Sequence, residues 1–579
     1  MRRGMKAMSR IVGIDLGTST SEIAILEGKK PFVIPNHLGE KITPSAVGLT
    51  DGGRIVVGKE ARDQLLFKPE DTVIEVKRLM GSLETVTMGG KEYTPQQISS
   101  FILAYLMDCA RKYLGEDIDR AVITAPAYFS DAQRRATVEA GKLAGIKVER
   151  IINEPTAASL DYGIDHMQTC QNILLYDLGG GTFDVTVLEM FEGVLDVKAS
   201  SGNNKLGGKD FDQRLMNYLL EQFITKHGLD LSNDKRTMMR LKEAVETCKI
   251  ALSEADEHHL VIPFFTEVEG NPVSLEEMVS REMFEGLIKE LIDSTEKQIS
   301  TVLSDARLAA SELDLILLVG GSTRIPYVRK FIEQTLGKAP QFVVDPELAV
   351  VRGAAVQAGI LSEELSSGED ILITDVCPYT LGTSVLGYIG GLPHTDIYDV
   401  IIPRNVTIPT VKEKVYMTVY DQQTAVEINI YQGEYKKASD NNFLGKIMLK
   451  GIPPAPAAEE KIKISFAYDV NGILQVEGEI LSTGKKANLM IETTGVEMVT
   501  EIEPEGWETA PNARKYKAII KKAERLLKED ETLYYSVDME SLIRKIKIGL
   551  KEGEDPEILA QLKEELHEII YELTEEGDA

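Results

Sequence analysis

The hydrophobic pattern changes twice along the chain. Up to about residue 365, short aliphatic runs typical of buried strands alternate with segments whose apolar positions recur every three or four residues, as in helices. From residue 376 to about 495, short alternating strands are separated by Gly, Pro and Asn, which predicts an antiparallel sandwich. From about residue 511 the helical spacing returns. The pattern therefore predicts a mixed α/β region, a β region and a helical tail.

Two predicted hairpins, residues 11–26 and 173–188, share one pattern. In each, an apolar strand ends in an aspartate (Asp15 or Asp177), a glycine-rich turn with small hydroxyl side chains follows, and a second apolar strand leaves. The two copies are about one subdomain apart in the chain. This repetition predicts a nucleotide clamped between two related halves.

The chemistry of the two turns suits phosphate and Mg²⁺. Glycine permits backbone angles and close approaches that other residues forbid, so the amides of such a turn can converge on phosphate oxygens. An aspartate at the strand end is well placed to hold a water on Mg²⁺. A glycine-rich hairpin turn without a ligand remains the alternative for a single copy, and the second copy favours the nucleotide.

Other polar residues have an ordinary explanation beside a functional one. Lys77 alone gives no signal beyond a solvated surface charge. Glu154 lies at a predicted strand-to-helix junction, where the helix dipole favours an acid. Glu246, Lys249 and Ser253 share one stripe of a predicted helix, which surface ion pairing would explain.

Three further segments can be placed. Residues 94–114 predict a helix with one apolar face, and a second helix is expected to begin at Ser130 and Asp131. Residues 313–326 predict a buried strand, another glycine turn and a helix behind Pro326, with backbone amides available to a ligand.

Composition and charge exclude several classes of protein. A chain of 579 residues is long for one core, so several domains are expected. The formal net charge of −28 argues against nucleic acid as a partner. No apolar run reaches the roughly 18 residues that span a bilayer, and Gly13, Asp15 and Gly17 interrupt the start, unlike a signal peptide. Four dispersed cysteines predict reduced thiols in a cytoplasmic protein.

The regions after residue 365 leave two alternatives open. Residues 366–370 predict a flexible link, and the apolar residues 371–373 after it predict either a strand end or an exposed docking peptide. In the tail, apolar stripes run through residues 519–527, 542–546 and 559–573, with Asp555 and Pro556 as N-cap and first helical residue. The stripes favour the core of a helical bundle over a partner surface.

Seven segments in order resemble one family, the DnaK-type heat-shock-seventy chaperones. They are residues 13–18, 76–81, 125–129, 151–158, 177–184, 319–326 and 353–358. The resemblance spans roughly residues 10 to 495. It implies an actin-like α/β ATPase domain with two lobes around a nucleotide cleft (1–365), an interdomain linker (366–375), a β-sandwich substrate-binding domain (376–495) and a short α-helical lid (496–579).

The resemblance also implies roles for residues of the ATPase domain. Phosphates would be cradled by Gly17, Thr18, Ser19 and Thr20 from one lobe and by Gly179, Gly180, Gly181 and Thr182 from the other. Asp15 and Asp177 would hold Mg²⁺ through waters. Lys77 would place its charge at the γ-phosphate and the attacking water, Glu154 would help to orient that water, and Asp15, Asp177 and Thr182 complete the catalytic set. Adenosine would be held by Glu246, Lys249, Ser253, Gly320, Gly321, Ser322, Arg324 and Glu347.

Further implications concern peptide, cofactors and partners. The sandwich would bind an extended peptide through main-chain hydrogen bonds and an apolar pocket. That pocket would be lined by Thr383, Val385, Leu386, Tyr416, Val419, Val426 and Ile428. Arg150, Leu372 and Asp375 would couple the domains. ATP or ADP and Mg²⁺ are the implied cofactors, with K⁺ as a further ion. The implied partners are unfolded or extended client polypeptides, a J-domain co-chaperone and a nucleotide-exchange factor, with no nucleic acid or membrane and a mostly monomeric chain.

Some positions depart from the commonest family pattern. Ile250 replaces an arginine of some members and Glu347 an aspartate, which bears on nucleotide affinity. Thr374 replaces an aliphatic residue of the linker. Thr383 and Val419 predict a narrower and more polar peptide pocket. Residues 507–579 match nothing in the family, and we expect a compact three-helix lid.

Three functions follow from these observations. The first is an ATP-driven chaperone, in which ATP and peptide bind to different domains with opposing preference. The second is a specialised nucleotide-dependent scaffold or regulator with the same fold and one dedicated partner, for which the short lid and altered pocket argue. The third is a sugar or metabolite kinase of the same superfold, against which the match of the sandwich argues.

Overall fold

The computed structural model covers the whole chain and describes most of it. The described residues are 10–164, 166, 169–268, 271–342, 345–362, 364, 372–389, 392–489, 499–500, 512–529, 539, 542–543, 546–547, 549–550 and 556–575. Several predictions fall outside them. These are the flexible link 366–370, Ile371, the boundaries near residues 365 and 495, and Asp555 as an N-cap.

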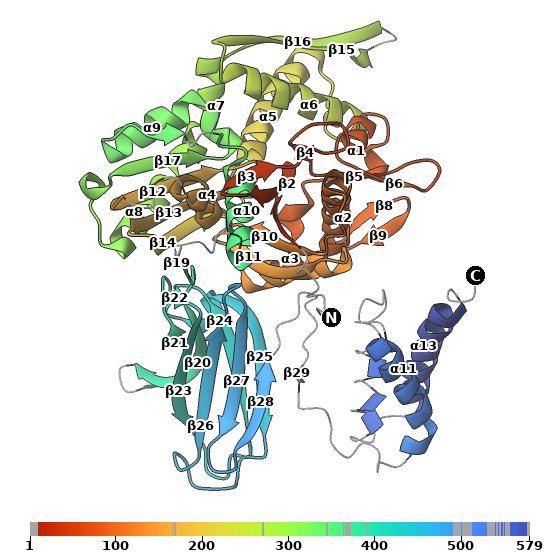
Figure 1. The fold of residues 1–579 in the computed structure, drawn as a ribbon, viewed down its shortest axis with the longest axis vertical. Coiled ribbons are helices and arrows are strands. Elements are labelled where there is room, and N and C mark those ends of the chain that lie inside the picture. The colour runs from red at the N-terminus through yellow and green to blue at the C-terminus, as the bar shows by residue number, and fades with distance from the viewer. Residues whose placement is uncertain are drawn as a thin grey trace, which may run out of the picture.

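The first half of the α/β region, residues 10–164, is called lobe I here and is built on a central sheet (Figure 1). Along this sheet the strands run β11-β10-β1-β2-β3, and β4 also pairs with β2. β1 is antiparallel to β2 and parallel to β10, so the first predicted hairpin is confirmed. The bounds are β1 (Ile11–Leu16), β2 (Thr20–Glu27), β3 (Lys30–Val33), β4 (Thr43–Pro44), β10 (Arg120–Ala125) and β11 (Lys147–Asn153).

The second half, residues 169–342, is called lobe II and repeats this arrangement. Its described strands run β18-β17-β12-β13-β14 and continue into β19 and β22. β12 is antiparallel to β13 and parallel to β17, as β1 is to β2 and β10. The bounds are β12 (Gln171–Leu178), β13 (Phe183–Phe191), β14 (Val194–Asn203), β17 (Leu315–Val319), β18 (Gln341–Phe342), β19 (Leu372–Val376) and β22 (Thr407–Ile408).

Two helices cross between the lobes. α4 (Glu154–Gly163) and α10 (Ala349–Leu361) pack so closely that a Cβ atom at Gly353 would lie 1.6 Å from the Ala157 carbonyl oxygen. Glycine is therefore required at this crossing. Around these two helices, Leu160, Leu175 and Val356 belong to one buried apolar cluster that joins both sheets.

The remaining elements of the lobes lie around the two sheets (Figure 1). In lobe I they are β5 (Ala46–Leu49), β6 (Ile55–Val57), α1 (Lys59–Gln64), β7 (Thr72–Ile74), β8 (Val86–Met88), β9 (Lys91–Tyr93), α2 (Pro95–Leu114) and α3 (Asp131–Leu143). In lobe II they are α5 (Gly208–His227), α6 (Lys235–Leu252), β15 (Glu257–Val268), β16 (Asn271–Ser280), α7 (Arg281–Asp293), α8 (Glu296–Ala306) and α9 (Pro326–Leu336).

Capping residues explain where two predicted helices begin. The Thr94 side chain accepts the Gln97 N–H at the start of α2, and Gln97 bonds back to the Thr94 N–H. Ser130 and Gln133 form the same reciprocal pair at the start of α3. Such capping boxes satisfy two backbone donors that a helix leaves free, so the predicted starting points of both helices are confirmed.

The β region consists of two antiparallel sheets that share one core. Ile430 of one sheet and Phe466 of the other are both fully buried in it. The first sheet contains β21 (Leu392–Ile402), β20 (Leu381–Ile389), β24 (Ala425–Gln432) and β25 (Asn442–Lys450). The second contains β23 (Thr410–Met417), β26 (Lys461–Tyr468), β27 (Leu474–Ile480), β28 (Lys485–Leu489) and β29 (Val499–Thr500). We call this pair of sheets the sandwich.

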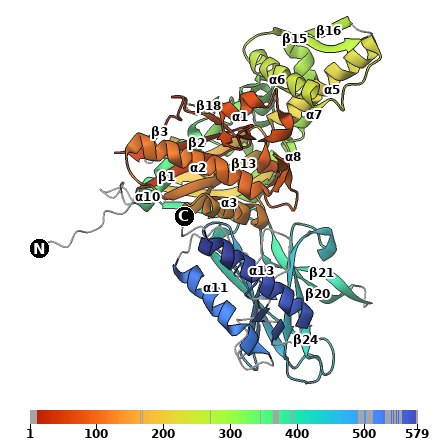
Figure 2. The ribbon, with the colours of Figure 1, turned by 90° about the vertical axis from the view of Figure 1, so that its right-hand side faces the viewer.

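The tail is helical in its described part. α11 (Lys517–Glu529) and α13 (Pro556–Glu575) lie side by side (Figure 2), and helical residues between 539 and 550 pack with them. Ile520, Ile546 and Leu566 are buried in their common core. The apolar stripes thus form a bundle core, as predicted, in the part of the tail that the structure describes.

The apolar linker segment forms a strand. In β19, residues 372–374 pair in parallel with β14 of lobe II, and residues 375–376 pair antiparallel with β22 beside the sandwich. Of the two alternatives for residues 371–373, the strand is correct for the two residues that are described.

Candidate functional site

Two tight turns, one from each lobe, meet in the cleft. The turn between β1 and β2 carries Thr18 and Ser19, and the turn between β12 and β13 carries Gly180 and Gly181. A Cβ atom added to Gly180 would lie 2.2 Å from Ser19 Oγ, and one added to Gly181 would lie 2.7 Å from Thr18 Cγ2. The turns can approach this closely because both positions in lobe II are glycine.

The glycine turn of lobe II is held from outside the cleft. The Gly179 carbonyl accepts hydrogen bonds from the Gly208 N–H at 3.0 Å and from the Ser322 hydroxyl at 2.9 Å. The Gly180 carbonyl accepts the Lys209 N–H at 2.9 Å. Because these carbonyl oxygens face lobe II, the opposite side of the turn, with its N–H groups, is available to an anion such as phosphate.

Asp15 and Asp177 occupy equivalent positions near the ends of β1 and β12 and line the same cavity. Thr124 donates a hydrogen bond to Asp15 Oδ1 at 2.7 Å. Burial and the nearby Glu154 raise the pKa of Asp15 to about 6, against the opposing effect of Lys77. Burial and Glu154 also raise the pKa of Asp177 well above its usual value. A cavity with this excess of negative charge is suited to a cation.

Lys77 and Glu154 form a buried ion pair in the same cavity. Lys77 lies on a 3-10 helix, η2 (Val76–Leu79), and Glu154 is the first residue of α4. Lys77 Nζ lies 2.5 Å from Glu154 Oε1, and the two side chains are only 5% and 11% exposed. Burial would lower the pKa of Lys77, but Glu154 and Asp15 outweigh it and raise that pKa. Lys77 is therefore a charged group inside the cleft and not a solvated surface lysine.

The residues of α6 that were expected at adenosine do not form one stripe of surface ion pairs. Glu246 reaches across to lobe I, where it pairs with Arg62, and also lies 3.0 Å from Lys209 Nζ. Lys249 turns into lobe II, where its Nζ lies 2.8 Å from the buried carboxylate of Asp212. The two side chains thus serve different neighbours.

The other predicted nucleotide-binding residues lie around the cavity. Those that line it with Asp15 are Gly17, Thr18, Ser19, Thr20, Gly179, Gly180, Thr182, Gly320, Gly321 and Glu347. The Arg324 guanidinium is half exposed, with its Nε 3.6 Å from Glu347 Oε1. The Ser253 hydroxyl donates to the Lys249 carbonyl at 3.4 Å. The fold therefore brings most of the predicted phosphate-side residues together.

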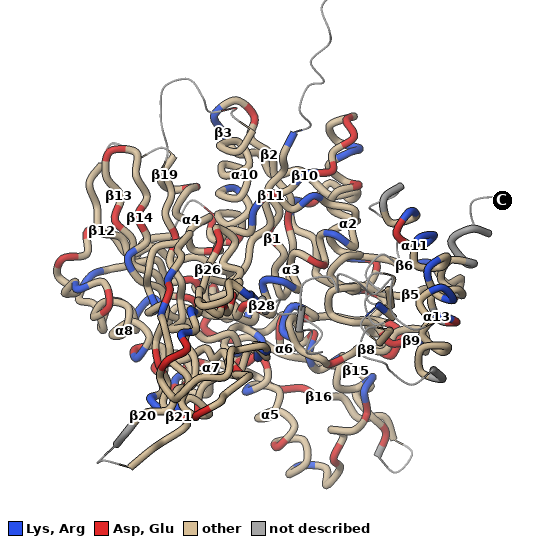
Figure 3. Tube along the Cα trace, turned by 90° about the horizontal axis from the view of Figure 1, so that it is seen from below, with Lys and Arg blue, Asp and Glu red and all other residues tan. Residues whose placement is uncertain are grey.

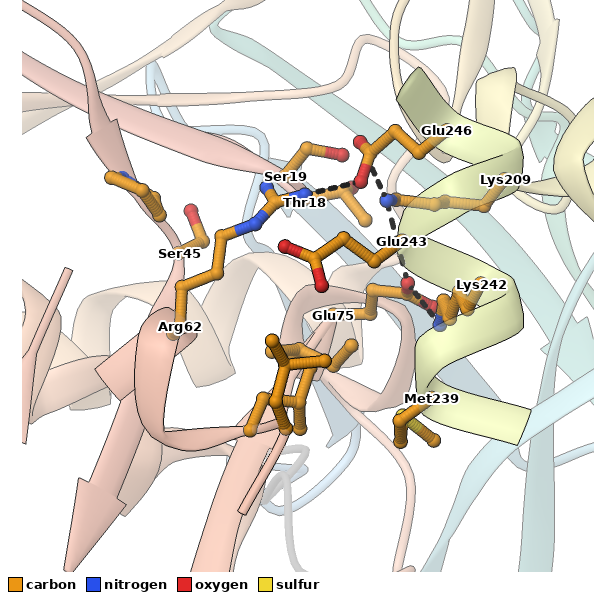
Figure 4. Close-up of a pocket in the computed structure, with 15 residues that line it drawn as sticks. Thr18, Ser19, Ser45, Arg62, Glu75, Lys209, Met239, Lys242, Glu243 and Glu246 are labelled. Carbon is orange, nitrogen blue, oxygen red and sulfur yellow. Dashed lines mark hydrogen bonds and ion pairs between the residues drawn. The ribbon is translucent and has the colours of Figure 1, made fainter. Parts of the chain in front are cut away.

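Beside this cavity, five charged side chains meet across the cleft (Figure 4). Arg62 and Glu75 come from lobe I, and Lys209, Lys242 and Glu246 come from lobe II. Glu75 Oε1 lies 2.6 Å from Lys242 Nζ and 3.7 Å from Lys209 Nζ. We call this group the cross-cleft cluster. Sequence motifs predict only Glu246, because isolated charges on unrelated segments give no signal until the fold brings them together.

The residues predicted for the peptide pocket are divided between the core and the surface of the sandwich. They lie on β20 (Thr383, Val385, Leu386), β23 (Tyr416), the loop after it (Val419) and β24 (Val426, Ile428). Thr383 is 1% exposed and donates to the Asn429 carbonyl at 2.7 Å, and Ile428 is 3% exposed in the core. Val419 is 42% exposed, and the remaining four are half-buried. Thr383 and Ile428 thus face the core.

The predicted coupling residues lie where the lobes meet the linker. Asp375 is buried on β19 and accepts the Thr156 hydroxyl from α4 at 3.1 Å. Burial lowers the pKa of Arg150, and Asp375 acts in the opposite direction. Leu372 has a largely exposed side chain, but its N–H donates to the Gly193 carbonyl at 3.1 Å. The linker is therefore tied to both lobes.

The sandwich also contacts both lobes directly. Asp131 at the start of α3 accepts the Leu474 N–H at 2.6 Å. From lobe II, Asp305 accepts a hydrogen bond from the Arg404 guanidinium at 2.8 Å. The sequence patterns did not predict these contacts, since the two partners of each contact lie far apart in the chain.

Other classes of site were searched in the part of the chain that the structure describes. There, no group of three or more His, Cys, Asp or Glu side chains is arranged to hold a metal ion alone. None of the described helices is both long and apolar enough to cross a membrane. All four cysteines are free thiols. Along the described part of the chain, Lys and Arg are interspersed with Asp and Glu (Figure 3).

Relatives of the chain carry a consistent description. A family model described as "Hsp70 protein" matches residues 11–579. The match includes the tail, so the expectation that residues 507–579 match nothing in the family is wrong. The chain is 44% identical over 570 residues to proteins named "Chaperone protein DnaK" from Thermotoga petrophila, Thermotoga maritima and Thermotoga neapolitana. These alignments cover 97% of this chain and 92% of each relative. The chain belongs to the Hsp70 family.

Proposed function

We propose that the cleft and the sandwich of this ATP-dependent molecular chaperone act as two coupled sites. The cleft takes ATP or ADP with Mg²⁺, and the sandwich takes extended segments of unfolded client polypeptides. The observation that carries this proposal is the pair of opposed hairpins, whose Asp15 and Asp177 line one cavity with the buried Lys77–Glu154 pair. Lobes I and II then correspond to the two lobes of an actin-like ATPase.

The cleft residues fit a nucleotide with a divalent cation. The Gly17 and Gly179 N–H groups donate to Ser21 Oγ and to the Thr182 carbonyl. The phosphates would instead meet the N–H groups and hydroxyls of the residues that follow, up to Thr20 on one side and Thr182 on the other. Asp15 and Asp177 would hold Mg²⁺ through waters, and the bound ion supplies charge neutralisation at the phosphates. Burial and the nearby Glu154 raise the pKa values of both aspartates, and a bound cation would favour their charged forms.

Lys77 and Glu154 divide the catalytic work between them. Lys77 carries its ammonium charge into the cavity, where it would stabilise negative charge on the γ-phosphate. Glu154 fixes the position of that ammonium and offers its second carboxylate oxygen to orient the attacking water. Thr182 lines the cavity from the second turn. Phosphoryl transfer needs mainly such positioning and charge, which these residues supply.

Adenosine would lie between the lobes, beside the cross-cleft cluster. Glu246, Lys249 and Ser253 approach it from α6, and residues 320–324 with Glu347 approach it from the other side. Lys249 is paired with Asp212, and Glu246 is paired with Arg62. Each of the two side chains would therefore reach the ribose only after its present ion pair breaks.

Peptide binding would use the exposed end of the sandwich. Val385, Leu386, Tyr416, Val419 and Val426 offer side chains at or near the surface, whereas Thr383 and Ile428 support them from the core. The tail helices would serve as a short lid. Arg150, Leu372 and Asp375 would couple the sites, and a J-domain co-chaperone and a nucleotide-exchange factor are the partners that such a cycle requires.

The test is the release rate of a fluorescent Leu-rich peptide from the full chain, with ADP bound and then with ATP bound. Coupling between two sites typically means that a ligand at one site changes the affinity of the other site by roughly 5- to 150-fold. We expect release to be faster with ATP by a factor in that range. Equal rates with both nucleotides, under conditions where both bind, would contradict the coupled-site proposal.

A further inference from the structure

Glu22 is a buried carboxylate on the floor of the cleft that the nucleotide site described above does not use. It lies on β2, is 2% exposed and lines the same cavity as Asp15. In the antiparallel ladder between β1 and β2, Glu22 is directly opposite Asp15. Residues directly opposite in such a ladder project from the same face of the sheet with their Cβ atoms about 4.5–5.5 Å apart. The two carboxyl groups are therefore neighbours.

Lobe II has the equivalent pair, with one difference. Asp184 is directly opposite Asp177 in the ladder between β12 and β13. Asp184 Oδ1 accepts the Tyr128 N–H at 3.1 Å, so this buried acid is satisfied by the protein backbone. The Glu22 carboxyl group interacts with the Thr20 hydroxyl, but its Oε1 accepts no hydrogen bond from any residue that the structure describes.

The charge balance of the cavity points to more than one cation. Its lining contains one ammonium group, Lys77, which is already paired with Glu154. The lining carboxylates are Asp15, Glu22, Glu154, Asp177 and Glu347, and of these Glu347 also lies 3.6 Å from Arg324 Nε. A nucleotide adds further negative charge. A buried charge without a partner is costly, so the free oxygen of Glu22 calls for a positive ligand.

We propose that Asp15 and Glu22 hold a second divalent cation of the Mg²⁺ type, bound together with the nucleotide, in addition to the ion between Asp15 and Asp177. Carboxylate and phosphate oxygens are the ligands that such hard cations prefer. Two carboxylates do not make a complete shell, and phosphate oxygens and waters fill the rest. The second ion therefore binds only with nucleotide. This inference rests on the proposed nucleotide site.

The test counts ions with Mn²⁺ as the probe. The full chain is freed of nucleotide and given one equivalent of ADP at constant K⁺, and Mn²⁺ is added while the electron paramagnetic resonance signal of the free ion is followed. We expect two bound Mn²⁺ per chain. In Glu22→Gln the second dissociation constant should rise by about tenfold or more, the loss typical of a disrupted metal site. Glu27→Gln, at the exposed end of the same strand, is the matched control and should retain both ions.

A second measurement covers the effect of the substitution on folding. Burial and the neighbouring Asp15 raise the pKa of Glu22, so its charged form destabilises the metal-free protein. Glu22→Gln removes that charge, so the metal-free variant should melt no lower than the metal-free wild type, and Mn²⁺ with ADP should raise its melting temperature less. One bound Mn²⁺ in the wild type, or a second dissociation constant in Glu22→Gln equal to that of the wild type, would overturn the proposal. Failure of ADP itself to bind would instead refute the nucleotide site on which it rests.

Discussion

The carboxylate of Asp131 accepts the backbone N–H of Leu474 at 2.6 Å, across more than half of the chain. Arg135, one turn further along α3, pairs with Asp131 at 2.6 Å and donates to the Leu474 carbonyl at 2.5 Å. One residue of the sandwich is thus held at both backbone groups by an acid and a base from lobe I. This double contact fixes the position of the sandwich under lobe I.

Removal of the acid should release this contact. A hydrogen bond to a charged group contributes about 1.5–3 kcal/mol, so Asp131→Ala should speed hydrogen exchange at the Leu474 amide by roughly 10- to 100-fold. Mass spectrometry of peptides that contain residue 474 measures this rate. Asp117→Ala, at a side chain that is 98% exposed, is the control. Unchanged exchange in Asp131→Ala would show that the contact does not hold the sandwich.

The buried Lys77–Glu154 pair predicts that removing the second partner restores stability but not ATP hydrolysis. Lys77→Met leaves Glu154 charged and unpaired, so the ATPase domain should lose about 3–5 kcal/mol of stability and ATP hydrolysis should fall by at least about 100-fold. The double variant Lys77→Met/Glu154→Leu should recover most of the stability and none of the activity. Thermal unfolding and single-turnover hydrolysis measure the two effects. A double variant as unstable as the single one would contradict the pairing.

The cross-cleft cluster should slow nucleotide release. Glu75 joins the lobes through Lys242 and Lys209, and a partly exposed ion pair contributes up to about 1 kcal/mol. Glu75→Gln should therefore release fluorescent ADP roughly fivefold faster in stopped-flow measurements, and the difference should shrink as salt is added. Glu70→Gln, at an exposed position of the 3-10 helix before β7, should release ADP at the wild-type rate. Equal ADP release rates for Glu75→Gln and Glu70→Gln would show that the cross-cleft cluster does not control ADP release.

The pairing of the linker strand predicts that the acceleration of peptide release by ATP depends more on the Leu372 backbone N–H than on the Leu372 side chain. The side chain is 58% exposed, whereas the N–H is bonded to the Gly193 carbonyl. Leu372→Pro removes this donor and should abolish the acceleration of peptide release by ATP, while Leu372→Asp should retain most of it. Release rates of a labelled peptide with ADP and ATP measure this. The reverse order of the two variants would show that the side chain carries the coupling.

The pKa of Glu246 predicts a stability difference that depends on pH. Burial acts to raise this pKa, but Lys209, Arg62 and Lys249 outweigh it and lower it from 4.5 to about 2. The folded state therefore favours the charged form, and this stabilisation is fully present above the unfolded-state pKa and lost as pH falls toward 2. The melting temperatures of the wild type and Glu246→Gln should differ by a constant amount above about pH 5 and converge below pH 4.5. A constant gap down to pH 3 would contradict this.

Local sequence patterns correctly predicted the features that are formed by residues close together in the sequence. The two hairpins, the aspartates at their strand ends and the capped starts of α2 and α3 follow from short segments, and the structure has them where they were expected. The contacts of Glu75 with Lys242 and of Asp131 and Arg135 with Leu474 were not predicted, because the partners lie far apart in the chain. Glu22 is different, since it follows Asp15 at the same spacing as Asp184 follows Asp177. That repetition was present in the sequence and could have pointed to it.

The linker strand β19 changes how the two domains move relative to each other. A flexible connection transmits only tension, whereas a strand that is hydrogen-bonded to β14 over residues 372–374 and to β22 over residues 375–376 also resists twist and shear. A rotation of lobe II therefore applies a torque to the sandwich through the sheet itself. While β19 is paired, the linker is a stiff connection between lobe II and the sandwich. It becomes a flexible connection only when those hydrogen bonds break.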